Sequence, residues 1–310
     1  MGDVATLEGK IRDLINNQNK QNILIKDTKL WHQLCSSLDV IGDTEIAIES
    51  YLSCDDISDK GLIYIFIYGI LQCLFLQQDA IKHMTESLKI LREKNDKLGK
   101  IRHIRNDSIG HPTKRDKNVE TTSNFIERMS MSKNGFILMI AGNDENELYK
   151  REYIDITELI KIQRECHKVI LQRIYNKLIE EQNMHKAKFR AEKLVDIFSK
   201  SDYIKQKVIE GCSSSDKRIG LTHIEMIDDI IKKFEAFLKK RNILPFYMNI
   251  EYEMKIIKYT IDELKVFFSD NDTCYLNNNS AYIFANYLNN KCEDMKNIAH
   301  EIDEDYEKDL

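Results

Sequence analysis

Glycine and proline are scarce in this chain, and their scarcity is the strongest constraint on its fold. Only 11 glycines and 2 prolines occur among 310 residues, well below the roughly 12% that these two residue types make up in average proteins. Both residues mark turns, so their scarcity favours long helices. Because 42% of the residues are apolar, the chain can bury sizeable cores in one large or two small domains.

Charge, cysteine usage and hydropathy exclude several classes of protein. The formal net charge is −5, from 46 basic and 51 acidic residues, so any contact with nucleic acid must be local rather than spread over the chain. The seven scattered cysteines form no Cys-x-x-Cys pair, which argues against a disulfide framework and a structural zinc. The start of the chain lacks the pattern of a signal peptide, and the apolar run 62–76 is too short for a bilayer and contains Gln72. We expect a soluble cytoplasmic protein with reduced thiols and no membrane partner.

Helical periodicity dominates the first third of the chain. It predicts helices over 4–16 and 22–39, and Asp43 after Gly42 predicts the N-cap of a third helix. The apolar run 62–76 continues at helical spacing through Leu91, which predicts one buried helix of about thirty residues. A further helix should end near Gly110, just before Pro112.

The period changes to alternation between residues 125 and 156, where we expect a small antiparallel β-meander with a turn at Asn134-Gly135. Asp155 and Glu158 form a capping-box pattern before a long helix that extends to about residue 198. The polar stretch from 199 and the Gly/Ser cluster at 211–220 mark a domain boundary, followed by helices near 223–241, 249–268 and 280–306. The expected fold is mainly α: a helical bundle with the meander (1–198) and a C-terminal helical domain (199–310).

One segment, residues 100–117, concentrates positive charge, with six basic and two acidic residues. On a helix, Arg102, Arg105 and Asn106 share a face, and two guanidinium groups there can grip a phosphate. His111 follows at the end of this helix. A histidine can move a proton near neutral pH while an arginine stabilises the charge of a phosphorane, which are the parts a metal-independent ribonuclease needs. The alternative interpretation is a solvated basic helix end.

The pattern Arg105-Asn106-x4-His111 resembles the motif of the HEPN superfamily (higher eukaryotes and prokaryotes nucleotide-binding), which is an arginine, a polar residue and a histidine after four to six further positions. The resemblance covers residues 1–195, while the meander and everything after 200 lie outside the family's helical core. Many members are ribonucleases that dimerise to bring two motifs together, often in toxin–antitoxin or antiphage systems. The resemblance thus implies a homodimer, an RNA substrate and, as a further partner, an antitoxin or other protein.

We therefore expect a metal-independent endoribonuclease of HEPN type without a cofactor or metal site. Arg105, Asn106 and His111 are its expected catalytic residues, and the expected substrate-binding residues are Arg102, His103, Lys114 and Arg115. The competing expectation is a non-catalytic helical module whose basic segment binds a nucleotide, a nucleic-acid backbone or an acidic protein partner.

Overall fold

The computed structural model describes residues 3–91, 93–110, 112–117, 120–141, 149–244, 248–269 and 274–308, and it confirms the expected fold class: mainly α with a small antiparallel sheet. Two compact units are present. Unit 1 comprises Met1–Ile15 and Asp27–Leu178, and unit 2 comprises Asn16–Lys26 and Ile179–Leu310. We expected the division after residue 198, but it falls between Leu178 and Ile179, inside a helix that continues to Phe189.

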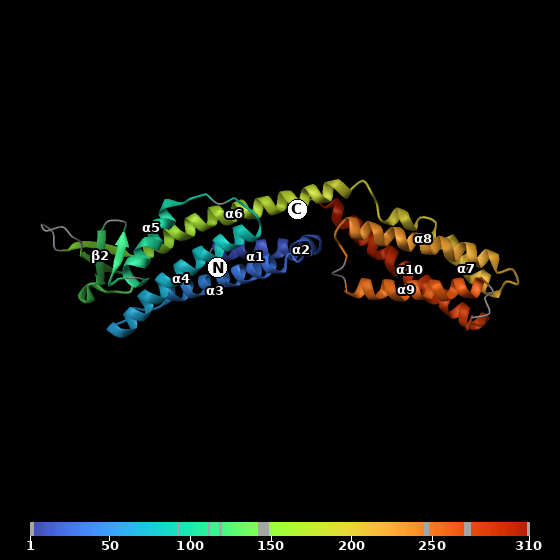
Figure 1. Ribbon diagram of the computed structural model, residues 1–310, viewed down its shortest axis with the longest axis horizontal. Helices are drawn as coiled ribbons and strands as arrows, with labels where there is room; N and C mark the ends of the chain where they lie inside the picture. The colour runs from blue at the N-terminus through green and yellow to red at the C-terminus, as the bar shows by residue number, and fades with distance from the viewer. Residues whose placement is uncertain are drawn as a thin grey trace. The chain divides into compact units, whose positions relative to one another are not determined.

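Unit 1 is built on helices that run side by side (Figure 1). Its helices are α1 (Asp3–Ile15), α3 (Thr28–Ser53), α4 (Lys60–Ser87), α5 (Asp96–Arg105) and most of α6 (Ile156–Phe189). The predicted break at Gly42 is wrong, because α3 passes through this residue without interruption. Ile41 and Ile48 are buried on one stripe of α3, and each such apolar burial is worth about 1.5–3 kcal/mol, more than the roughly 1 kcal/mol cost of a helical glycine.

The long apolar helix is confirmed as α4, and it lies in the core of unit 1. Ile67, Leu71 and Leu74 are fully buried against residues of the other helices and the sheet. Among the described residues, α4 alone is long and apolar enough to cross a membrane by length and composition. The core helix of a soluble protein has the same properties, so this is weak evidence for a span.

The sheet caps the end of the bundle where α3 ends and α6 begins (Figure 1). Its strands are ordered β1-β2-β3-β4 and pair antiparallel, with β1 (Arg115–Lys117), β2 (Glu120–Ile126), β3 (Gly135–Ala141) and β4 (Lys150–Asp155). The predicted meander is confirmed as β2 to β4, and β1 was not foreseen. The tight turn is centred one residue earlier than expected, since Ser132 pairs with Gly135, and a 3-10 turn at Arg128–Ser130 precedes it.

The predicted cap of the long helix is present at the start of α6, where the Glu158 N–H donates to Asp155 Oδ1 over 3.0 Å. The helix ends at Phe189 rather than near 198. A short 3-10 turn (Val195–Phe198) follows, and Asp303 accepts hydrogen bonds from the N–H groups of Leu194 and Val195, both 3.0 Å long. This side-chain capping of a new turn replaces the continuation of the helix.

Unit 2 is a bundle of four long helices with α2 (Gln18–Leu24) added to it, and its members are α7 (Ser201–Ser213), α8 (Arg218–Lys240), α9 (Met248–Phe268) and α10 (Asn278–Glu307). Helices α7 and α9 each pack against α8 and α10. The boundary expected at 211–220 is wrong, because this segment joins α7 to α8 inside the unit. Its glycines permit close packing: a Cβ on Gly211 would lie 2.7 Å from Gly220 Cα.

Candidate functional site

Arg105 is held in a fixed position at the end of α5. Its Nε and Nη2 groups donate to Gln72 Oε1 over 3.2 and 2.7 Å, and its Nη1 donates to Asn106 Oδ1 over 3.0 Å. The guanidinium carbon also lies 4.4 Å from the centre of the Phe75 ring. Arg105 is half-buried, so it differs from the freely solvated basic side chain of the alternative interpretation.

A π-helical turn, Asn106–Gly110, follows α5 and shapes the site. Such turns are rare and are frequent at functional sites. Its wider winding brings Gly110 back beside Arg105, because a Cβ on Gly110 would lie 2.8 Å from Arg105 Nη1 and 3.2 Å from Asn106 Oδ1. The absence of a side chain at Gly110 therefore lets the guanidinium of Arg105 approach this closely. The predicted helix end at Gly110 is confirmed, although its last turn is π rather than α.

Neither family models, curated proteins nor solved structures match this chain. The contacts of the described residues therefore carry the functional interpretation.

Arg102 shares the face of Arg105, as its spacing predicts. Its guanidinium carbon lies 4.1 Å from the centre of the same Phe75 ring, and its Nη1 donates to Asp79 Oδ1 over 2.7 Å. Asp79 and Arg102 are both about one-third exposed at their side chains. An incoming phosphate would have to compete with the Asp79 carboxylate for Arg102, whereas Arg105 has no carboxylate partner in the part of the chain that the structure describes.

The remaining predicted site residues are less well placed by the structure. His111, the expected proton-transfer residue, lies outside the described residues. His103 on α5 and Lys114 after the π-helical turn are exposed. Arg115 begins strand β1, and its side chain also lies outside the description. Hydrogen bonds tie the chain after Gly110 to β2: the Asn124 N–H donates to the Pro112 carbonyl over 2.6 Å.

Sequence reasoning missed the three residues of α4 that position the arginines. Gln72, Phe75 and Asp79 are spaced by three and four residues, so they share one face of α4. The available signal was the pair of polar side chains, Gln72 and Asp79, seven residues apart and therefore on one face of a mainly apolar helix. What the sequence does not show is that α5 packs against this face of α4.

The opposite face of α4 is fixed by a buried polar cluster. Gln77 Nε2 donates to Glu45 Oε1 of α3 over 2.7 Å, and Gln163 Nε2 of α6 donates to Gln77 Oε1 over 2.9 Å. His167 Nδ1 lies 3.0 Å from the same Gln77 oxygen. Because these side chains are almost fully buried, their hydrogen bonds specify one register of α3, α4 and α6. The same register sets the position of Gln72 along α4, opposite Arg105.

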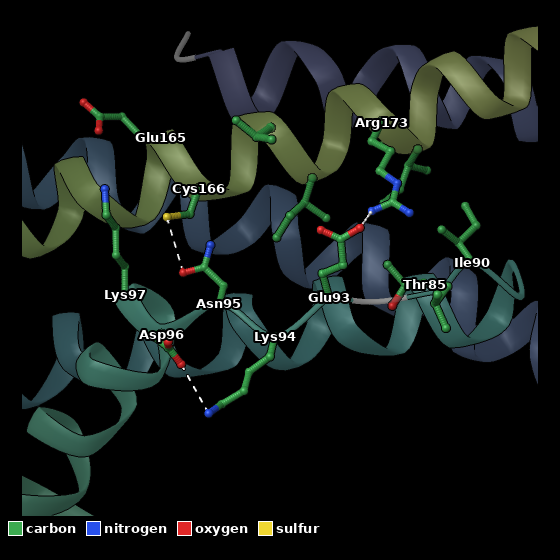
Figure 2. Close-up of a pocket in the computed structure, with 14 residues that line it drawn as sticks. Thr85, Ile90, Glu93, Lys94, Asn95, Asp96, Lys97, Glu165, Cys166 and Arg173 are labelled. Atoms are coloured by element: carbon green, nitrogen blue, oxygen red, sulfur yellow. Dashed lines mark hydrogen bonds and ion pairs between the residues drawn. The ribbon is translucent and has the colours of Figure 1, made fainter.

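A hollow lies between α6 and the connection from α4 to α5 (Figure 2), with a volume of about 610 Å³. An ion pair joins its two sides, from Arg173 of α6 to Glu93 (2.8 Å), and a second pair, Lys94 to Asp96 (3.3 Å), lies on one side. Acidic and basic side chains are equal in number along its lining, so it has no excess charge to select a phosphate. None of the predicted site residues lines it.

The described part of the chain offers few candidate residues for a metal site or for a nucleophilic thiol. No three His, Cys, Asp or Glu residues gather there in a way that could hold a metal ion. All seven cysteines are free thiols. Burial raises the pKa of Cys212 to about 11 and that of Cys292 to about 12, so these two thiols are poor nucleophiles at neutral pH.

Proposed function

We propose that this protein is a metal-independent endoribonuclease of the HEPN type, acting in the cytoplasm. The observation that supports the proposal is the fixed guanidinium of Arg105, bonded to Gln72 and Asn106 and packed against Gly110. His111 follows Gly110 directly in the sequence. Arg105 and Asn106 therefore meet at the end of α5, and the proposal assigns the proton transfer to His111, the residue that follows Gly110 in the chain.

Arg105 is suited to a transition state rather than to loose binding. Its three hydrogen bonds to Gln72 and Asn106 occupy three of the five N–H groups of a guanidinium. As far as the described residues go, two N–H groups are left to donate to a phosphate. Since their direction is fixed before the substrate arrives, they stabilise developing charge without a cost of reorganisation.

The proposed reaction is transfer of the scissile phosphate to the neighbouring ribose hydroxyl. His111 removes the proton of the 2′-hydroxyl, O2′ forms a bond to phosphorus, and Arg105 stabilises the negative charge of the phosphorane. The bond from phosphorus to O5′ then breaks, and O5′ takes up a proton from a general acid. The products carry a 2′,3′-cyclic phosphate and a 5′-hydroxyl.

A second copy of the chain would supply the general acid, and α4 carries a surface on which it can pack. Leu62, Ile65, Tyr68 and Leu76 are 42–65% exposed along the outward side of this helix, and Gln72 lies among them at helical spacing. Apolar stripes of this kind mark interfaces. Two chains that meet through α4 would bring their Arg105 sites close to one another around a two-fold axis.

Paired isoleucine variants test this dimer. Ile65 on α4 and Ile46 on α3 have the same side chain and the same 65% exposure. Ile65→Asp should give a monomer in light scattering and lose RNA cleavage, whereas Ile46→Asp should do neither. A fully active Ile65→Asp monomer would contradict the role of the second copy.

Cleavage of a single-stranded RNA in the presence of EDTA tests the function itself. Arg105→Ala and His111→Ala should abolish cleavage but leave most of the binding, and a 2′-deoxyribose at the scissile position should block it. Arg218 and His223 in unit 2 have four residues between them, against five between Arg105 and His111, so Arg218→Ala with His223→Ala is the control and should stay active. Activity that EDTA removes and magnesium restores would refute the mechanism. If no RNA is cleaved and all basic-segment variants only weaken binding, the non-catalytic module is the correct interpretation.

A further inference from the structure

The sheet of unit 1 has one face on the core and one face exposed. Successive residues of a strand point to opposite faces. The inner face is marked by the buried apolar side chains of the described strands, which are Phe136, Leu138 and Ile154. The register places Phe125, Met139 and Arg151 in one row across β2, β3 and β4, and Ile137 beside Tyr153 in the next row. These two rows alternate with the buried residues, so they belong to the outer face.

Three aromatic side chains are exposed on or beside this outer face. Phe125 and Tyr149 are each 44% exposed, and Tyr153 is 59% exposed. The rings of Phe125 and Tyr149 meet edge to face with their centres 5.6 Å apart. Because buried aromatic rings are the rule in a core, three exposed rings on one small sheet need a reason outside the core.

A glycine in the next strand supports the ring of Tyr153. A Cβ on Gly135 would lie 2.8 Å from the Tyr153 hydroxyl and 3.0 Å from its Cζ. The ring therefore lies against the backbone of β3 at Gly135, where a Cβ would also meet the backbone carbonyl oxygen of Ile154. Supported from below and open to solvent above, this ring is preorganised to accept a second flat group.

Arg151 adds positive charge between the aromatic residues. It alternates with Tyr149 and Tyr153 along β4, and its side chain is 55% exposed. One of its nitrogens, Nη2, donates to Glu127 Oε2 over 2.6 Å, which holds the guanidinium over the sheet. A phosphate would have to compete with the Glu127 carboxylate for Arg151, but the exposed face of the guanidinium can stack on a base.

We propose that this outer face, with Phe125, Tyr149, Arg151 and Tyr153, binds the unpaired bases of single-stranded RNA. Aromatic side chains on an open sheet stack bases that are not paired, and a cation among them complements the phosphates. A partner protein would be better matched by a continuous aliphatic stripe such as that of α4. The inference rests on the proposed function and deepens it, since it makes single-stranded RNA the substrate class.

Strand β2 connects this face to the candidate site. Phe125 points outward from β2, while the N–H of its neighbour Asn124 donates to the Pro112 carbonyl and Ser123 Oγ donates to the Thr113 carbonyl over 3.0 Å. The segment that follows Gly110 is thus bonded to the strand that carries Phe125. An RNA strand stacked on the outer face would have its backbone guided toward the site.

Binding of an uncleavable probe tests the proposal independently of catalysis. The probe is a fluorescein-labelled single-stranded 2′-O-methyl oligoribonucleotide of about 12 nucleotides, within the usual range of site sizes, measured by anisotropy with the full chain. Tyr153→Ala should weaken binding about five- to hundredfold, in line with the loss of one stacked base. Tyr153→Phe keeps the ring and should bind as the parent does. Tyr252→Ala is the matched control, because Tyr252 of α9 is 62% exposed.

Unchanged binding by Tyr153→Ala, or equal binding of a duplex of the same sequence, would overturn the proposal. A change of oligomeric state in Tyr153→Ala would overturn it in favour of a protein interface. Arg151→Ala should weaken binding severalfold and keeps the proposal falsifiable if Tyr153→Ala does not fold. Probe binding that depends on Tyr153 in a protein that cleaves no RNA would refute the proposed function and support the binding face. RNA cleavage by a protein whose probe binding does not depend on Tyr153 would support the proposed function and refute the binding face.

Discussion

Replacing Gly110 by alanine should move the guanidinium of Arg105 without changing the stability of the fold. The new Cβ would lie 2.8 Å from Arg105 Nη1, and ordinary contact begins at 3.4 Å, so the guanidinium must retreat by about 0.6 Å. Both atoms that obstruct the methyl group, Nη1 and Asn106 Oδ1, are ends of side chains. They can move without shifting the backbone, and the turn itself should persist.

The expected loss is in turnover. A retreat of Arg105 disturbs its bonds to Gln72 and Asn106 and re-aims the two remaining N–H groups. Misplacement of a catalytic group by roughly 1 Å costs about 10²-fold in rate, so kcat should fall about 10- to 100-fold in Gly110→Ala. Stability should change little, because alanine is favoured over glycine in a helix by up to about 1 kcal/mol, which offsets the steric cost.

Gly99→Ala provides the control in the same helix. An added Cβ at Gly99 meets no atom within 4 Å, so this variant should be more stable by up to about 1 kcal/mol and retain its kcat. Urea unfolding gives the stabilities, and single-turnover cleavage gives the rates. A folded Gly110→Ala protein that cleaves RNA at the parent rate would refute the reasoning, and so would an equal loss of rate in Gly99→Ala.

Three further predictions concern unit 2. Gly220→Ala should lower the free energy of unfolding by about 1–3 kcal/mol, because its Cβ would lie 2.2 Å from the Phe268 ring; urea unfolding measures this. Burial alone would raise the pKa of Asp228, but hydrogen bonds from Lys232 and Lys265 outweigh it and lower the pKa. The carboxylate thus stabilises the fold above its unfolded pKa of about 3.9. This stabilisation should be lost as the pH falls through the lower pKa of the folded state. In Asp228→Asn it should be absent at every pH. Iodoacetamide at pH 8 should leave Cys292 unmodified in the native protein, since burial raises the pKa of this thiol to about 12; peptide mass spectrometry would detect its modification.

Local sequence patterns predicted those helices and strands in which the apolar residues of the sequence are also the residues buried in the structure. The apolar residues of α4 repeat at helical spacing over the whole helix, and the scarcity of glycine and proline made long helices the safest expectation. The error at Gly42 arose because a residue that ends an isolated helix is tolerated where Ile41 and Ile48 are buried. Likewise α7 has a polar sequence, but Ile204, Val208 and Cys212 are buried on one stripe four residues apart.

The candidate site was predicted only in part, for a different reason. The spacing of Arg102 and Arg105 predicted their common face, because residues three positions apart in a helix lie on the same side of it. Gln72 bonds to Arg105 across 33 residues of sequence, and the pairing depends on how α5 packs on α4. Such a pairing follows from tertiary packing, which no local period encodes.

The two segments of unit 2 are made at very different times on the ribosome. Asn22 in α2 donates from Nδ2 to the carbonyls of Asn242 and Ile243, and the second of these bonds spans 221 residues. At about 5–20 residues per second, roughly 10 to 45 s of synthesis separate the donor from its acceptors. During this delay α2, only 7 residues long, is shorter than an isolated helix that would be stable in water. A nascent chain therefore exposes this segment to chaperones and proteases long after the residues that place Arg105 have emerged.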